Sequence, residues 1–297
     1  MMLARVIGIS TGKYGVSRFV RMSTIPQAPN LDDTRDMLKK FPGGSVDLDL
    51  DSTSGIAVLS LNHVNKMNAM SGQMMVELTE RVTELESWSE GKAVIFTGAG
   101  NTFCSGGDLS TVRGIFDPEN GYQMCYYMQN ATTRFWNLPL LTFALIKGRA
   151  LGGGAELATA CDFRLMSSSA KLGFVQAKMG VTTGWGGGTR LEQLLGRTKS
   201  LSLLCSGRVL DAKTAQEIGL VDHVLEDVES ELTDVKSLIA SQYCSPDRSI
   251  VRAMKSLATA ASDNNVCEAL EIERNIFRTK WGSPLHVAAI NNNVKHK

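Results

Sequence analysis

The chain has 297 residues, 43% of them hydrophobic, and its 31 basic and 30 acidic residues give a formal net charge of +1. This length and apolar content are sufficient for one large core with an appendage. The balanced charge gives no reason to expect a nucleic-acid or membrane partner, and no apolar run approaches the roughly 20 residues of a membrane-spanning helix.

The first 22 residues differ in composition from the rest of the chain. They contain four basic residues and no acidic one, with serine and threonine interspersed. Such a segment is typical of a mitochondrial transit peptide, and a short disordered cytosolic tail is the alternative. We expect residues 1–45 to be an N-terminal extension that is disordered or used for targeting.

From Val46 onward the pattern is that of a folded core in which strands alternate with helices. Apolar runs predict strands at residues 55–61, 93–96, 140–146, 163–166 and 220–224. Apolar residues at helical spacing predict helices at residues 71–86, 122–136, 212–218, 228–243, 248–260 and 265–279. We therefore expect an α/β core over residues 46–227 and a helical region over residues 228–297.

A glycine-rich turn follows the apolar run at 140–146. Its sequence is Ala150-Leu151-Gly152-Gly153-Gly154-Ala155-Glu156-Leu157. Glycines between a strand and a helix let the backbone approach a ligand, and the first N–H groups of the helix suit an oxyanion or a phosphate. Glu156 could carry a proton there. The alternative is a tight turn whose acidic residue is stabilised by the helix dipole.

A second glycine turn comes about 45 residues earlier, after the apolar run at 93–96. Its sequence is Phe103-Cys104-Ser105-Gly106-Gly107-Asp108-Leu109. Asp108 is expected to cap a short helix. Two such turns can direct two N–H donors at one oxygen, which is the arrangement of an oxyanion hole.

Four further segments accompany the two turns: Asn65-Lys66-Met67-Asn68-Ala69-Met70, Ala170-Lys171-Leu172-Gly173-Phe174, Gly184-Trp185-Gly186-Gly187-Gly188-Thr189-Arg190-Leu191 and Ala215-Gln216-Glu217-Ile218-Gly219-Leu220-Val221. With these segments in this order, the chain resembles the crotonase (enoyl-CoA hydratase/isomerase) superfamily over about residues 48–280. The resemblance implies a spiral of ββα repeats with a C-terminal helical trimerisation region. It also implies an acyl-CoA substrate without a separate cofactor, and a homotrimer or a dimer of trimers.

The resemblance also assigns residues. It places the two oxyanion donors at the backbone amides of Gly107 and Gly153, and it puts Glu156 where hydratases keep one catalytic glutamate. The second glutamate is replaced by Gln176. Because an amide cannot shuttle protons, a plain hydratase is disfavoured. The loop that wraps CoA in the family implies four contact residues here: Asn65, Lys66, Met67 and Ala69.

Within the superfamily, the closest resemblance is to members that decarboxylate short branched malonyl-CoA thioesters. It implies conversion of ethylmalonyl-CoA to butyryl-CoA, and use of methylmalonyl-CoA as well. Loss of CO2 leaves an enolate, so an oxyanion hole would contribute most of the catalysis. The resemblance favours the cytosol, with the mitochondrial matrix as the alternative.

Four side chains with hydrogen-bond donors could hold the substrate carboxylate: Gln176, Thr182, Thr183 and Trp185. Alternatively, the two threonines are turn residues and Trp185 is part of the core. Glu156 could deliver the final proton if burial keeps it partly protonated, and a helix N-terminal acid is the alternative. Arg190 is expected to pair with a carboxylate in a structural role.

Other functions stay open at this stage. An enoyl-CoA isomerase or hydratase-type enzyme could use Glu156, and a catalytically silent CoA-binding protein could keep the same turns. A nucleotide-binding switch is disfavoured, because the chain has no Gly-x4-Gly-Lys-[Ser/Thr] motif. No metal site is expected, because the four histidines are scattered and the six cysteines lack the spacing of zinc ligands.

Overall fold

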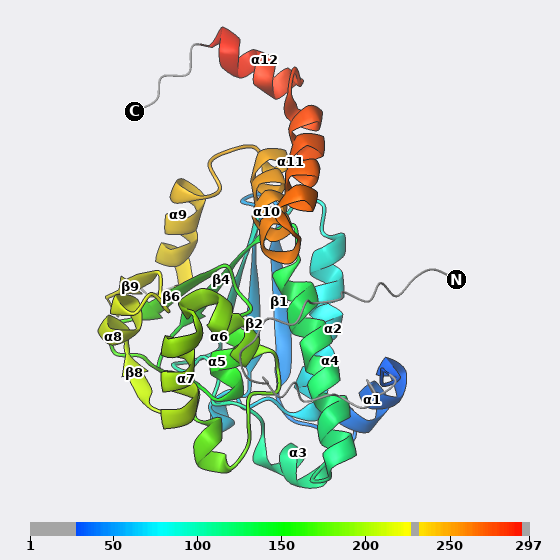
Figure 1. Cartoon of the computed structure of the whole chain (residues 1–297), viewed down its shortest axis with the longest axis vertical. Helices are drawn as coiled ribbons and strands as arrows, with labels where there is room; N and C mark the ends of the chain where they lie inside the picture. Colours follow the sequence, from blue (N-terminus) through cyan, green and yellow to red (C-terminus); the bar gives the residue numbers. More distant parts are fainter. Residues whose placement is uncertain (1–27, 227–231, 293–297) are drawn as a thin grey trace, which may run out of the picture.

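The structure is a computed structural model that describes residues 28–226 and 232–292 (Figure 1). The targeting segment expected within residues 1–22 lies outside these ranges. The described residues form a six-stranded sheet with the order β1-β2-β3-β4-β6-β9 and a three-stranded sheet with the order β5-β7-β8. The strands are β1 (Ser45–Asp51), β2 (Ile56–Asn62), β3 (Ala93–Gly98), β4 (Leu141–Ile146), β5 (Arg149–Leu151), β6 (Phe163–Ser167), β7 (Lys171–Gly173), β8 (Val209–Asp211) and β9 (His223–Leu225).

The larger sheet is parallel except for its first pair, β1 with β2. Its central strands are apolar on both faces, as expected for parallel strands that are covered on both sides. In β3, Val94 and Phe96 belong to one core cluster, whereas Ala93 and Ile95 belong to a second. The predicted α/β class is confirmed, and the two clusters explain why this strand is a continuous apolar run in the sequence.

The first core cluster lies between the sheet and a pair of packed helices, α2 (Gly72–Ser87) and α4 (Pro118–Trp136) (Figure 1). The side chain of Ser71 caps α2 and accepts a hydrogen bond from the amide of Met74. α4 begins four residues before the predicted start, because Asp117 caps it and Pro118 fits the first helical turn.

The helix α1 (Leu31–Leu38) was not predicted. It is short and mostly polar, yet Leu38 is fully buried and the helix packs against α2 and α4. It falls within residues 1–45, which we expected to lie outside the core. A division of the chain at residue 45 therefore separates α1 from the helices that it packs against.

The C-terminal part of the described chain is helical, as predicted. Its helices are α9 (Leu232–Gln242), α10 (Arg248–Asp263), α11 (Val266–Lys280) and α12 (Pro284–Asn291), and α11 and α12 extend beyond the sheet at one end of the molecule (Figure 1). Neither α11 nor α12 contains a buried residue. Within the described ranges, no helix combines the length and apolarity needed to cross a membrane.

Short helices connect the strands around the smaller sheet and hold the residues of the candidate site. They are α3 (Leu109–Gly114), α5 (Gly153–Ala158), α6 (Gly187–Leu195), α7 (Arg197–Ser206) and α8 (Ala212–Glu217), together with the 3₁₀ turns η1 (Val64–Lys66) and η2 (Gln176–Met179). As predicted, Asp108 caps α3 and accepts hydrogen bonds from the amides of Ser110 and Thr111. Asp211 caps α8 in the same way.

Candidate active site

The two glycine turns, residues 103–109 (the first turn) and 150–157 (the second turn), lie next to each other. Cys104 and Ala150 form a parallel bridge, and the amide of Leu151 donates to the carbonyl of Cys104 at 3.0 Å. A Cβ atom placed on Gly106 would lie only 3.4 Å from the amide nitrogen of Gly153. The fold therefore brings together the two turns that the sequence singled out.

The amides of Gly107 and Gly153 are both available to a ligand. Gly107 is held in place by Met70, whose amide donates to the carbonyl of Gly106 and whose carbonyl accepts from the amide of Asp108, both at 2.8 Å. Gly153 is the first residue of α5, and the first N–H groups of a helix have no partner within it. Within residues 28–226 and 232–292, neither amide donates a hydrogen bond.

Two glycines of the second turn are required by close packing. A Cβ atom on Gly153 would lie 2.3 Å from the indole of Trp185, and one on Gly154 would lie 2.1 Å from the carbonyl oxygen of Cys104. Both distances are far below van der Waals contact. Any side chain at these positions would therefore push the two turns apart or displace the indole.

Glu156 lies in the first turn of α5 and is 2% exposed. Its Oε2 accepts hydrogen bonds from the amides of Trp185 at 2.8 Å and Gly187 at 2.9 Å. Its Oε1 accepts from the amide of Gly184 at 3.2 Å and from Nε2 of Gln176 at 2.9 Å. Burial raises the pKa of Glu156 above its ordinary value, and the four donors oppose this rise because they favour the carboxylate.

Trp185 forms a wall beside the two free amides. It is 5% exposed, and its indole lies against Gly153 and within 3.9 Å of where a Cβ of Gly107 would be. Its backbone amide donates to Glu156, and its indole N–H donates to Sδ of Met124 on α4 at 3.1 Å. We expected Trp185 to offer a donor to the substrate carboxylate; instead, both of its N–H groups have partners within the protein.

The other three residues expected to hold a carboxylate are placed differently. Gln176 uses its Nε2 on Glu156, and among the described residues nothing bonds to its buried Oε1. Thr182 is exposed and Thr183 is half-buried. The structure therefore gathers Gln176 and Trp185 around Glu156, whereas among the described residues no hydrogen bond joins Thr182 or Thr183 to this carboxylate.

The loop expected to bind CoA lies beside the first turn. Asn65, Lys66 and Met67 are exposed, and the carbonyl of Met67 accepts from the amide of Ser105 at 3.0 Å. Ala69 is buried; its amide donates to the carbonyl of Lys66 at 3.0 Å, and its carbonyl lies 3.0 Å from Nδ1 of His63. The side chain of Ala69 therefore supports the loop from inside, and the first three residues form its outer surface.

Lys66 links this loop to the first turn. Its ammonium group lies 2.7 Å from Oδ2 of Asp108, with the lysine side chain 50% exposed and the aspartate 4% exposed. Burial alone would raise the pKa of Asp108, but hydrogen bonds from Lys66, Ser110 and Thr111 outweigh burial and hold this pKa well below its ordinary value. The ion pair therefore ties the loop of Lys66 to the residue that follows Gly107.

The sequence profile of the enoyl-CoA hydratase/isomerase family matches residues 51–284 of this chain. The chain belongs to this family. Solved structures of family members agree with the fold. An enoyl-CoA hydratase from Bacillus anthracis superimposes with a TM-score of 0.76 at 28% identity, covering 84% of this chain and 96% of that one.

More similar relatives bear the name ethylmalonyl-CoA decarboxylase. The protein of this name from Danio rerio is 46% identical over 267 residues, covering 89% of this chain and 88% of its own. The Rattus norvegicus protein is 44% identical, with 89% of each chain covered. The Homo sapiens protein is 43% identical, covering 87% of this chain and 84% of its own.

We call residues 184–187 the tryptophan loop. Sequence reasoning did not identify the residues that bond to the carbonyl groups of this loop. Nε2 of Gln129, on α4, donates to the carbonyl of Gly184 at 2.9 Å. Arg190, expected to pair with a carboxylate, instead donates to the carbonyl of Trp185 at 3.0 Å and to Oγ1 of Thr132 at 2.8 Å. That expectation was wrong, because both acceptors that Arg190 meets are neutral, one on α4 and one in the loop itself. The helical spacing of Gln129 and Thr132 was the available signal.

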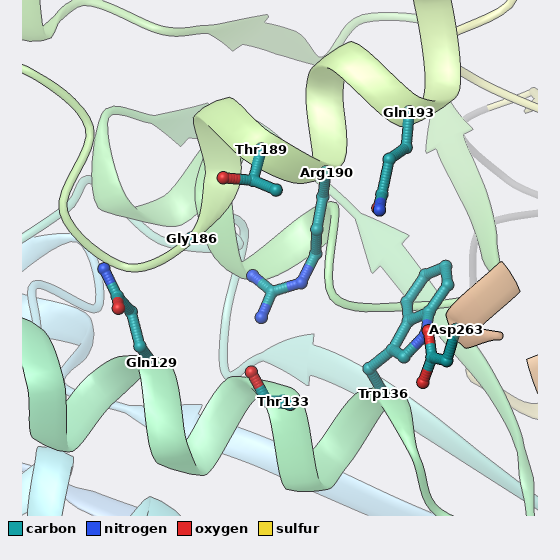
Figure 2. A pocket seen from close by; sticks show the side chains of 8 residues that line it. All are labelled: Gln129, Thr133, Trp136, Gly186, Thr189, Arg190, Gln193 and Asp263. Carbon is teal, nitrogen blue, oxygen red and sulfur yellow. The ribbon is translucent and has the colours of Figure 1, made fainter. Parts of the chain in front are cut away.

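Figure 2 shows the far side of the tryptophan loop. A cavity of about 310 Å³ lies there between α4 and α6, with Gln129 and Thr133 on one side and Thr189, Arg190 and Gln193 on the other. None of the lining residues belongs to either glycine turn. This cavity is therefore distinct from the two free amides.

The described residues disfavour two other types of site. Within residues 28–226 and 232–292, no group of three or more His, Cys, Asp or Glu side chains could hold a metal ion. Cys104 belongs to the first turn and pairs with Ala150 of the second, but burial raises the pKa of its thiol to about 12. A thiol that stays protonated is a poor nucleophile, which agrees with the structural role of Cys104 in pairing the turns.

Proposed function

We propose that this chain decarboxylates short branched malonyl-CoA thioesters, converting ethylmalonyl-CoA to butyryl-CoA and accepting methylmalonyl-CoA as well. The observation that carries the proposal is the pair of neighbouring free amides at Gly107 and Gly153, next to a position where Gln176 replaces a second carboxylate. The names of relatives that are 43–46% identical over most of the chain support it.

The two amides would act on the thioester carbonyl. When the bond between the α-carbon and the carboxylate breaks, its electron pair moves into the thioester and CO2 leaves. The resulting enolate oxygen accepts hydrogen bonds from Gly107 and Gly153, and one well-placed donor of this kind contributes roughly 3–4 kcal/mol to transition-state stabilisation. No base is needed to start this reaction, so a single carboxylate near the site is sufficient.

The wall of the site suits the departing group. The indole of Trp185 lies beside both glycines, and a Cβ on Gly107 would lie 3.4 Å from Cγ2 of Val112. These apolar surfaces exclude water from the reacting carboxylate. Desolvation disfavours the charged carboxylate relative to neutral CO2, so it adds to the effect of the two donors.

The rest of the assignment follows the family. We propose that Asn65, Lys66, Met67 and Ala69 contact the CoA part of the substrate, and that no separate cofactor takes part. The chain is proposed to assemble as a homotrimer or a dimer of trimers through its C-terminal helices, where Phe277 is 58% exposed. Its proposed location is the cytosol, with the mitochondrial matrix as the alternative.

The decisive experiment is product identification with the purified full-length protein. Malonyl-, methylmalonyl-, ethylmalonyl- and crotonyl-CoA and a 3-enoyl-CoA are supplied separately, and the products are identified by mass spectrometry. We expect butyryl-CoA and CO2 from ethylmalonyl-CoA, and no hydration or isomerisation of the unsaturated thioesters. Isomerisation of the 3-enoyl-CoA without any CO2 release from ethylmalonyl-CoA would overturn the proposal in favour of an isomerase. No turnover of any thioester would favour a silent CoA-binding protein.

A further inference from the structure

We infer that Glu156 is a positioning residue: its carboxylate fixes the tryptophan loop, and through it the indole of Trp185, against the oxyanion turn, and it does not protonate the enolate. The inference rests on the proposed function and assigns a different role to the one carboxylate nearest the reacting atoms. It is carried by the four hydrogen bonds that this carboxylate accepts and by the packing of the loop that they hold.

The carboxylate of Glu156 has no acceptor site left over. An ionised carboxylate offers about four lone-pair positions, and four donors fill them, two on each oxygen. Three of these donors are backbone amides, which cannot reverse their role. A proton on Oε2 would face the N–H groups of both Trp185 and Gly187, and one on Oε1 would face that of Gly184. Proton transfer through this group therefore requires the loop to open.

The tryptophan loop is held from its other side as well. Its amides bond to Glu156, while its carbonyls accept from side chains of α4 and α6. Gln129 bonds to the carbonyl of Gly184, and Arg190 bonds to that of Trp185. A Cβ on Gly187 would lie 2.4 Å from Cγ of Glu156. The loop is therefore fixed between a buried negative charge on one face and polar side chains on the other.

One side chain of the loop, that of Trp185, contacts the proposed oxyanion site. The indole of Trp185 lies against Gly153, whose amide is one of the two proposed oxyanion donors. Glu156 belongs to the same short helix as Gly153. Helix α5 thus supplies a donor at its first residue and, one turn later, the carboxylate that holds the indole against that donor.

The final proton then has a different source, which we assign to water. Water is excluded while the carboxylate is in place and enters the space that CO2 vacates; the electron pair of the enolate then forms a C–H bond at the α-carbon. An O–H bond of water breaks in the same step, and hydroxide passes to the solvent. This balances the reaction with no change in the protonation of Glu156.

The test compares Glu156→Gln, Glu156→Ala and Glu156→Asp with Glu192→Gln, a matched change at an exposed glutamate of α6. The first readout is amide hydrogen exchange in the absence of substrate. We expect the Gln and Ala variants to speed exchange at Trp185 and Gly187 by about tenfold or more, because these amides lose their acceptor. In the Gln variant the new NH2 group faces backbone donors, so it should disturb the loop nearly as much as Ala does.

The second readout is the pH dependence of ethylmalonyl-CoA decarboxylation. The Gln and Ala variants should lower kcat by about 10²-fold, comparable to displacing an oxyanion donor. The shape of the pH profile should stay that of the wild type, and the Asp variant, which keeps the charge, should recover part of the rate. Glu192→Gln should match the wild type. Normal exchange at both amides together with loss of the alkaline limb of the profile, where a proton donor would become deprotonated, would overturn the inference and make Glu156 the proton donor.

A variant on the other side of the contact keeps the inference testable if changes at Glu156 prevent folding. Gly187→Ala leaves the carboxyl group in place but forces the loop away from it. We expect the same loss of kcat with an unchanged pH profile, whereas wild-type kcat would overturn the inference. Because exchange is measured without substrate and the wild type is assayed alongside, failure of the proposed function would be seen separately, as wild-type protein that releases no CO2.

Discussion

The backbone amide of Trp185 donates a 2.8 Å hydrogen bond to Glu156, and the indole of the same tryptophan lies against the backbone of Gly153. One residue thus connects a buried carboxylate to a free amide of the candidate oxyanion hole. Because a Cβ on Gly153 would lie 2.3 Å from the indole, the site depends on the absence of a side chain as much as on any side chain present.

Gly153→Ala should therefore disable the enzyme. The new methyl group must displace the indole or the start of α5, which moves one of the two oxyanion donors. We expect kcat/KM for ethylmalonyl-CoA to fall by about 10²–10³-fold, the loss typical of removing one donor. Steady-state kinetics check this.

The matched control is Gly121→Ala, since a Cβ there has no neighbour within 4 Å. It lies inside α4 and should stabilise the protein by up to about 1 kcal/mol through helix propensity, with activity unchanged. Equal activity of both variants would contradict the role of Gly153.

The Lys66–Asp108 pair should make stability depend on pH. The pKa of Asp108 is lowered in the folded protein. Its contribution to the free energy of unfolding is therefore fully present above the unfolded pKa, about 4, and is lost as the pH falls through the folded pKa. Asp108→Asn should lower the free energy of unfolding at pH 7 by about 1 kcal/mol, because lysine is half-exposed and the pair is partly screened. Urea denaturation checks this.

A double-mutant cycle with Lys66→Met isolates the pair. The coupling energy should be about 1 kcal/mol or less at pH 7 and low salt, and it should shrink as salt is added, because a half-exposed pair is screened. A coupling that is the same at low salt and in about 1 M salt would show that the two side chains do not interact as an ion pair.

Gln176→Glu should reduce decarboxylation and change its pH dependence. The variant places a second carboxylate where Nε2 lies 2.9 Å from Oε1 of Glu156. Two carboxylates this close repel, and one of their pKa values rises until a proton is shared. We expect activity relative to the wild type to be lowest near pH 8 and to recover as the pH falls towards 6.

The control for this change is Gln193→Glu on α6, which lines the cavity behind the loop and should show no such recovery. Parallel assays with crotonyl-CoA show whether the restored carboxylate pair supports hydration. A ratio of variant to wild-type activity that is flat between pH 6 and 8 would contradict the coupling between Gln176 and Glu156.

The local features of the site could be predicted from the sequence. Each glycine turn follows an apolar run, and the cap at Asp108 is set by residues within three positions of it. The contact between the two turns could be inferred from the family resemblance. The partners of Glu156 could not, because Gly184, Trp185 and Gly187 lie 28–31 residues away, and backbone donors leave no trace in a sequence pattern.

The parts of the fold that were missed have a similar cause. Helix α1 is short and polar, so its burial depends on the helices that it meets rather than on its own pattern. The strands β5, β7 and β8 have three residues each, too few for periodicity to be recognised. Arg190 was assigned a carboxylate partner by analogy, whereas its acceptors come from Thr132 and the loop carbonyl.

Substitution of Trp185 should separate packing from hydrogen bonding in the wall of the site. Trp185→Phe keeps an aromatic ring beside Gly153 but loses the indole N–H bond to Met124, a weak bond because a thioether is a poor acceptor. The Trp185→Phe substitution should lower the free energy of unfolding by less than about 1.5 kcal/mol, and it should enlarge the space beside the acyl group. Trp185→Ala removes the wall and should cost about 3–5 kcal/mol.

The two variants should differ in substrate preference as well as in stability. Trp185→Phe should raise the kcat/KM ratio of a propyl- or butyl-branched malonyl-CoA relative to ethylmalonyl-CoA, since the added space accommodates one or two more methylene groups, each worth about 1 kcal/mol of binding. Trp185→Ala should lose activity on every substrate, because water reaches the reacting carboxylate. Competition assays with mixed thioesters measure the ratio directly. An unchanged ratio in Trp185→Phe would place the acyl branch away from the indole.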